Sequence, residues 1–171
     1  APKHVESFKI LAREGYFNGT SFHRVIPGFV IQGGDPNSKD GDRYNDGQGG
    51  RAGKYYGVGE EENPDTWMLP AEFNDRPHKR GTLSMARSSQ ENSAGSQFFI
   101  CVDDLPQLDD MYTVFGEVIE GLDTVDRIVD TLTPRKRNSN YQRPDGDNPV
   151  FGMFMDVTIG TAEKLKLDLS I

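Results

Sequence analysis

Short apolar runs separated by glycine and proline constrain the fold of this chain more than any other feature of the sequence. The 171 residues include 19 Gly and 10 Pro, and these residues divide a chain into turns. The distribution therefore favours a β-rich fold built from many short strands. No apolar run approaches the ~20 residues that a membrane-spanning helix needs. The length fits one domain, residues 1–171, with a sizeable core.

Two of these runs are joined at Pro27-Gly28 and predict a pair of strands over residues 21–26 and 29–32. Arg24 and Gln32 are polar residues inside these apolar strands. If the strands pair, both side chains emerge on one outer face beside an apolar pocket. Further strands are predicted over residues 82–86, 97–102, 113–118, 153–159 and, from strict polar–apolar alternation, 164–171.

Two segments have helical patterns. Residues 2–15 and 122–132 each place apolar side chains on one stripe, and Pro2 and Gly15 suit the two ends of the first helix. Residues 33–63 and 135–149 are polar and predict long loops. Short strands flanked by two helices favour a closed antiparallel barrel that is capped at its ends.

The charge and the reactive residues exclude several classes of function. A net charge of −8 and a pI near 4.9 disfavour a nucleic-acid partner, which usually requires a basic face. The single cysteine, Cys101, lies in an apolar run and is expected to be a buried, inert thiol. The three histidines lack metal-ligand spacing, and the glycine-rich segment 47–52 has no strand before it and no helix after it. We therefore expect no metal and no cofactor.

Several blocks of the sequence resemble, in order, the signatures of the cyclophilins, a family of peptidyl-prolyl cis–trans isomerases. They are FHRVIPGF at 22–29, QGGD at 32–35, GTLSMA at 81–86, GSQFFI at 95–100 and VFGEV at 114–118. The resemblance implies a mostly β fold, an eight-stranded closed antiparallel barrel with a helix at each end. Members carry a strand hairpin ahead of the segment that corresponds to Ala1. We expect that this hairpin is missing from the chain, rather than replaced by 164–171, because one eight-residue run cannot stand in for two strands.

The resemblance also implies an activity, the rotation of X–Pro peptide bonds during protein folding. A fixed cation beside the prolyl nitrogen stabilises the twisted amide more than either planar state, and Arg24, held by Gln32, is the predicted catalyst. A non-catalytic proline-peptide binding or scaffold module of the same fold is the alternative, which the presence of Arg24 disfavours. The predicted substrate-binding residues are Phe29, Val30, Ala86, Arg87, Ser88, Gln97, Phe99, Leu108 and Tyr112.

Three positions depart from the commonest family pattern. Val30 replaces a methionine, Tyr112 a histidine, and Gln107 the tryptophan whose indole N–H binds cyclosporin in the family. We therefore expect cyclosporin to bind weakly at most. The expected partners are proline-containing peptides and unfolded proteins, and the expected oligomeric state is a monomer.

Overall fold

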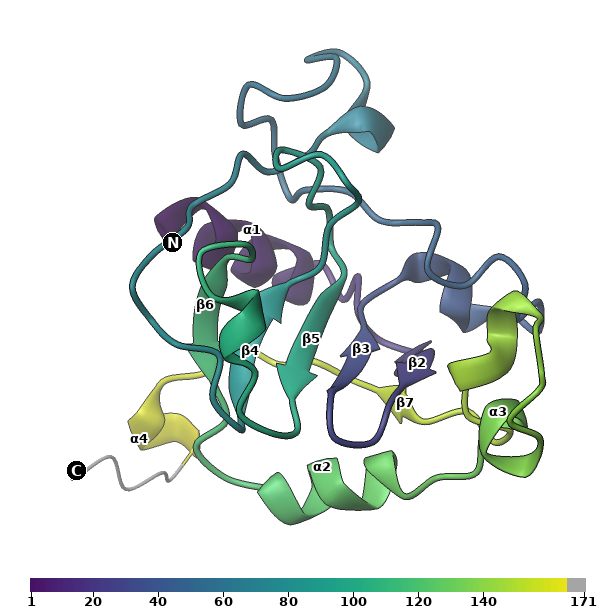
Figure 1. Ribbon diagram of the computed structural model, residues 1–171. Coiled ribbons are helices and arrows are strands. Elements are labelled where there is room, and N and C mark those ends of the chain that lie inside the picture. Colours follow the sequence, from purple (N-terminus) through teal and green to yellow (C-terminus); the bar gives the residue numbers. More distant parts are fainter. Residues whose placement is uncertain (166–171) are drawn as a thin grey trace.

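A computed structural model describes residues 1–165 and arranges their antiparallel strands in two open sheets (Figure 1). The larger sheet has five strands in the order β2-β3-β5-β4-β6, and the smaller one pairs β1 with β7. The strands of the larger sheet are β2 (Arg24–Val25), β3 (Val30–Gly33), β4 (Thr82–Met85), β5 (Phe98–Cys101) and β6 (Val114–Glu117). Those of the smaller sheet are β1 (Thr20–Ser21) and β7 (Phe154–Met155).

The prediction of a closed eight-stranded barrel is wrong. Residues 1–165 contain seven strands, and β2 and β6 are the two open edges of the larger sheet. The strand predicted over 21–26 is split, because Ser21 pairs with Phe154 in one sheet while Arg24 pairs with Gln32 in the other. The strand predicted over 153–159 pairs only at β7. Because β7 pairs with β1 at only two positions, the smaller sheet does not join the β6 edge of the larger sheet to its β2 edge.

Both predicted helices are present. Helix α1 (Pro2–Arg13) lies behind the larger sheet, and α2 (Leu122–Val129) crosses below its lower end (Figure 1). Helix α2 ends before Leu132, which is exposed rather than on the buried stripe. The strand predicted over 164–171 begins inside α4 (Ala162–Leu165), and residues 166–171 lie outside the described part of the chain. The shorter helices are α3 (Pro134–Arg137), η1 (Pro36–Lys39), η2 (Pro64–Thr66), η3 (Pro106–Leu108) and η4 (Pro144–Asp147).

Strand β5 distributes its side chains between separate parts of the core. Phe98 packs under α1 with Leu11 and Phe17, whereas the next residue, Phe99, belongs to a different cluster on the other side of the strand. Ile100 packs with residues of α2. This alternation follows from the two-residue period of a strand. Each buried aromatic or aliphatic side chain contributes about 1.5–3 kcal/mol to the free energy of folding.

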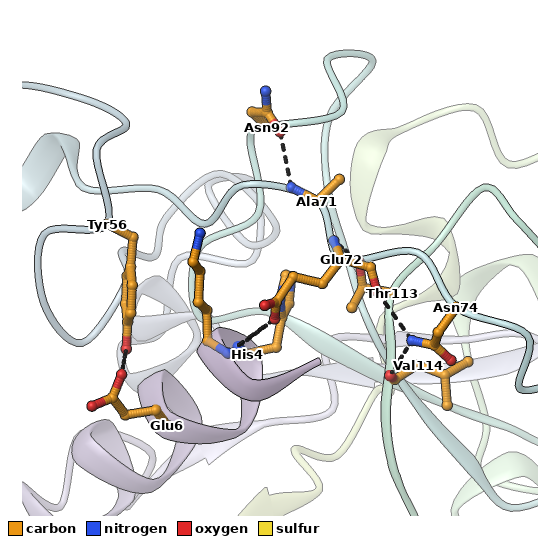
Figure 2. Close-up of polar contacts among 10 residues, drawn as sticks. His4, Glu6, Tyr56, Ala71, Glu72, Asn74, Asn92, Thr113 and Val114 are labelled. Atoms are coloured by element: carbon orange, nitrogen blue, oxygen red, sulfur yellow. Dashed lines mark hydrogen bonds and ion pairs between the residues drawn. The ribbon is translucent and has the colours of Figure 1, made fainter.

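A carboxylate fixes the beginning of α1 against the segment that leads to the sheet (Figure 2). Glu72 accepts hydrogen bonds from the backbone N–H groups of Lys3 and His4, at 3.0 and 3.1 Å, and lies 2.9 Å from Nδ1 of His4. Asn74 in turn donates to the carbonyl of Val114 in β6 at 3.0 Å. A negative charge at a helix N-terminus is stabilising, so Glu72 holds the beginning of α1. Asn74, which also donates to the carbonyl of Glu72 at 3.0 Å, continues this contact to β6. Burial lowers the pKa of His4, and its contact with Glu72 only partly opposes this shift.

Among the described residues, no helix combines the length and the apolar character that crossing a membrane requires.

Candidate active site

The candidate site begins at the edge of the larger sheet, where Arg24 in β2 lies directly opposite Gln32 in β3. Residues that face each other in an antiparallel pair project their side chains from the same side of the sheet. Nη1 of Arg24 accordingly donates to Oε1 of Gln32 at 3.2 Å. The guanidinium carbon lies 5.7 Å from the ring centroid of Phe29, within the range of a cation–π contact. The cation is therefore held from two directions while it remains half-buried.

A chain of amide groups extends this contact across the sheet. Nε2 of Gln32 donates to Oε1 of Gln97 at 2.9 Å, and Nε2 of Gln97 donates to the carbonyl of Gly49 at 2.8 Å. Both ends of each glutamine side chain therefore have a partner. Since each group fixes the orientation of the next, the chain presents the Arg24 guanidinium in one arrangement.

An apolar cluster lies beside the cation and contains the side chains predicted to bind a proline ring. Its buried members are Val30, Phe99, Cys101, Leu105 and Leu108, and Phe29, Ala86 and Tyr112 pack against them. Phe99 is 5% exposed and its ring meets that of Tyr112 edge-on at 5.6 Å. Phe99 therefore forms the floor of the cluster, with Phe29 and Tyr112 at its edge. Burial raises the pKa of the Cys101 thiol to about 12, so this residue remains a packing group.

The structure adds three polar residues that our sequence analysis did not place in the site. The ring of His78 stacks on that of Phe99, with centroids 6.1 Å apart and planes 18° apart. Its Nδ1 lies 2.8 Å from Asp109 and its Nε2 lies 2.9 Å from Oγ of Ser84. Ser84 is fully buried, so this serine, histidine and aspartate cannot attack a substrate and instead fix the ring beneath Phe99. No short sequence motif marks the three residues, which come together only through the fold.

Hydrogen bonds from His78 hold Asp109 in its ionised form. The backbone N–H of His78 donates to Oδ1 of Asp109 at 2.7 Å, and the ring reaches the same oxygen. These contacts lower the pKa of the Asp109 carboxyl, the backbone bond most of all. The contact also joins the segment before β4 to the end of η3, which carries Leu108.

The predicted backbone-binding residues follow β4. The N–H of Ala86 donates to the carbonyl of Gln97 at 2.9 Å, and Ser88 is exposed beside Ser93. The Arg87 side chain turns back to donate to the carbonyl of Met111 and lies 4.9 Å over the Tyr112 ring. A hollow of about 300 Å³ runs between Ala86, Ser88 and the glutamine pair Gln32–Gln97. All eleven predicted site residues therefore lie in or around one continuous region.

Two comparisons with known sequences identify the family. The family model described as cyclophilin type peptidyl-prolyl cis-trans isomerase/CLD matches residues 1–148. A probable peptidyl-prolyl cis-trans isomerase of Brucella abortus (strain 2308) is 50% identical over 128 residues, which are 75% of this chain and 61% of that protein. A peptidyl-prolyl cis-trans isomerase of Helicobacter pylori (strain ATCC 700392 / 26695) is 42% identical over 130 residues, 75% of this chain and 68% of that protein. The chain thus spans about three fifths of the Brucella relative.

A comparison with solved structures indicates the same family. A cyclophilin type peptidyl-prolyl cis-trans isomerase of Cryptosporidium parvum, crystallised in the presence of the dipeptide Ala-Pro, superimposes with a TM-score of 0.71. It is 31% identical, and the match covers 91% of this chain and 83% of that one. With a family model that matches most of the sequence and a shared fold, this chain belongs to the cyclophilin-type peptidyl-prolyl cis-trans isomerase family.

Proposed function

We propose that the protein is a peptidyl-prolyl cis–trans isomerase that rotates X–Pro bonds in proline-containing peptides and unfolded proteins. The observation that carries this proposal is the position of Arg24, which is held by Gln32 and lies against Phe29 at the edge of the apolar cluster. Family membership supports the same activity, as does the Ala-Pro dipeptide supplied to the Cryptosporidium parvum relative.

The proposed mechanism requires no covalent step. Rotation about an X–Pro bond faces a barrier of about 18–20 kcal/mol, because the resonance of the amide must be broken. In the twisted state the nitrogen lone pair is localised and accepts a hydrogen bond. A guanidinium is charged at all physiological pH values and directs its donors in a fixed plane. Arg24 therefore stabilises the twisted state selectively, while the proline ring occupies the cluster of Phe29, Val30, Phe99, Leu108 and Tyr112.

The remaining predicted residues are assigned to the substrate backbone. Ala86, Arg87 and Ser88 offer main-chain donors and acceptors next to the hollow, and Gln97 offers an amide to a substrate carbonyl. Main-chain recognition does not depend on the sequence of the peptide. This arrangement therefore supports action on many proline-containing segments.

The proposal is tested by measuring isomerase activity on a proline peptide by magnetisation-exchange NMR. Arg24→Ala is expected to lower kcat/KM at least tenfold, which corresponds to about 1.4 kcal/mol. Arg24→Lys is expected to be similarly poor, because an ammonium lacks the planar arrangement of donors. Arg127→Ala, at an exposed arginine of α2, is the matched control and should retain full activity.

Two results would overturn the proposal. Wild-type rates in both Arg24 variants would remove Arg24 from the catalytic step. Binding of proline peptides by the wild-type protein without any turnover would instead identify it as a binding module.

A further inference from the structure

A second cavity adjoins the hollow beside Ala86, and the linings of the two share Gln32 and Gly47. It has a volume of about 310 Å³ and is lined by both Arg24 and Gln32, so it is continuous with the candidate site. Its outer wall comes from two long loops that the sequence places far apart, through Asp46 and through Asp145 in η4. Figure 1 shows these two segments side by side at the right of β2.

Direct contacts join the two loops into one wall. Arg43 donates to the carbonyl of Asn148 at 2.6 Å, and the Asn148 side chain donates to Asp46 at 2.6 Å. Arg143 donates to the hydroxyl of Tyr44 at 2.8 Å. The wall therefore consists of residues fixed by several hydrogen bonds, although it is built from loops.

The carboxylates that line the cavity differ in whether they have a cationic partner. Asp145 lies 3.6 Å from Arg43, and Asp147 pairs with Arg135. For Asp46, in contrast, the described residues provide no cation within ion-pair distance, and its hydrogen bond comes from the neutral side chain of Asn148. Burial raises the pKa of the Asp46 carboxyl, and the hydrogen bond from Asn148 and the charge of Arg43 only partly oppose this shift.

A second, independent feature indicates that the cavity accepts a polar group. His23 lines it and is 5% exposed, yet both of its ring nitrogens are buried without a hydrogen-bond partner. Burial lowers the pKa of His23, so the ring is neutral near pH 7 and offers one free acceptor nitrogen. Buried polar groups of native proteins nearly always have a partner, and a ligand that donates hydrogen bonds would satisfy the acceptor nitrogen of His23 and the carboxylate of Asp46.

From these observations we propose that this cavity is a specificity subsite that takes the lysine or arginine side chain of a substrate residue on one side of the proline. This inference rests on the proposed isomerase function. A peptide that crosses the sheet from Ala86 to Arg24 leaves the site over β2 and next meets the cavity. A basic side chain there pairs with the carboxylate of Asp46 and donates to His23.

The test uses short peptides with one proline, in which lysine, norleucine or glutamate occupies each of the two positions before and the two after the proline. The kcat/KM of each peptide is measured by magnetisation-exchange NMR at low ionic strength. On one side of the proline only, lysine is expected to exceed norleucine about fivefold, and glutamate is expected to be the poorest. In Asp46→Asn the preference for lysine should fall to within twofold.

Asp40→Asn is the matched control, because Asp40 is an exposed carboxylate of the same loop and does not line the cavity. It changes the net charge by the same amount and should keep the preference for lysine. An equal preference in Asp46→Asn would attribute it to the general negative charge of the protein and overturn the proposal. The absence of any preference, or the same preference on both sides of the proline, would also overturn it.

These outcomes are distinct from a failure of the proposed function. A wild-type protein that isomerises every peptide at the same rate contradicts the subsite alone. A wild-type protein that isomerises none contradicts the function, and the affinities of the same peptides, measured by NMR titration, then decide whether the cavity selects a basic residue.

Discussion

Truncation of Phe99 to alanine is expected to damage both stability and catalysis. The side chain is 5% exposed and contacts the rings of His78 and Tyr112. Removal of a buried phenylalanine costs about 3–5 kcal/mol of unfolding free energy. This is a large part of the roughly 5–15 kcal/mol available to an ordinary domain. Urea unfolding followed by circular dichroism measures this loss.

The neighbouring Phe98 provides the matched control, because it is 4% exposed but packs under α1 against Phe8 and Phe17. Phe98→Ala should lose a similar unfolding free energy of about 3–5 kcal/mol. Isomerase activity is then compared at a temperature where both variants are fully folded. Phe99→Ala should lose at least tenfold in kcat/KM, mainly through a higher KM, whereas Phe98→Ala should remain within threefold of the wild type.

Equal losses of kcat/KM in the two folded variants would refute the assignment of Phe99 to the apolar cluster that holds the proline ring. If either alanine variant fails to fold, the corresponding Phe→Leu pair, which removes less volume, provides the same comparison.

Three further results are expected. Cyclosporin should inhibit the wild-type protein weakly. Gln107→Trp should raise the affinity for cyclosporin by about ten- to a hundredfold, or 1–3 kcal/mol, with little change in kcat/KM. Nanomolar inhibition of the wild type would contradict this prediction. Because burial lowers the pKa of His4 below its ordinary value of 6.5, the unfolded chain binds the proton first. Stability should therefore fall as the pH drops below about 6.5. Urea titrations at pH 7.5 and 5.5 should show this loss of unfolding free energy in the wild type, and a smaller loss in His4→Gln. Asp109→Ala should lower kcat/KM severalfold by releasing the ring under Phe99, whereas the exposed Asp103→Ala should not, as the same exchange assay would show.

The local pairing of the candidate site could be predicted from sequence, but its supports could not. Arg24 and Gln32 are eight residues apart on either side of a Pro-Gly turn, so their position on one face follows from the pairing of two adjacent strands. His78 and Asp109 are in contact although they lie 31 residues apart in the sequence, and no periodic pattern predicts that contact.

The error in the global fold has a related cause. Counting short strands indicates a β-rich domain, but it does not show which edges meet. The two residues of β7 that pair with β1 are far fewer than the predicted run, and the larger sheet stays open between β2 and β6. The long loops likewise appeared only as polar segments, because the contacts of Arg43 and Asp46 with Asn148 span more than a hundred residues.

The register between β2 and β3 has a consequence for how this enzyme scaffold can diversify. The groups assigned to bond rotation are fixed by strand pairing, so they resist change as long as the ladder is intact. The walls around them belong to loops, and lengthening a flexible loop twofold costs only about 0.6 kcal/mol. Insertions can therefore alter which flanking residues are favoured while Arg24 and Gln32 keep their positions. Related scaffolds are expected to differ most in sequence preference and least in their chemistry.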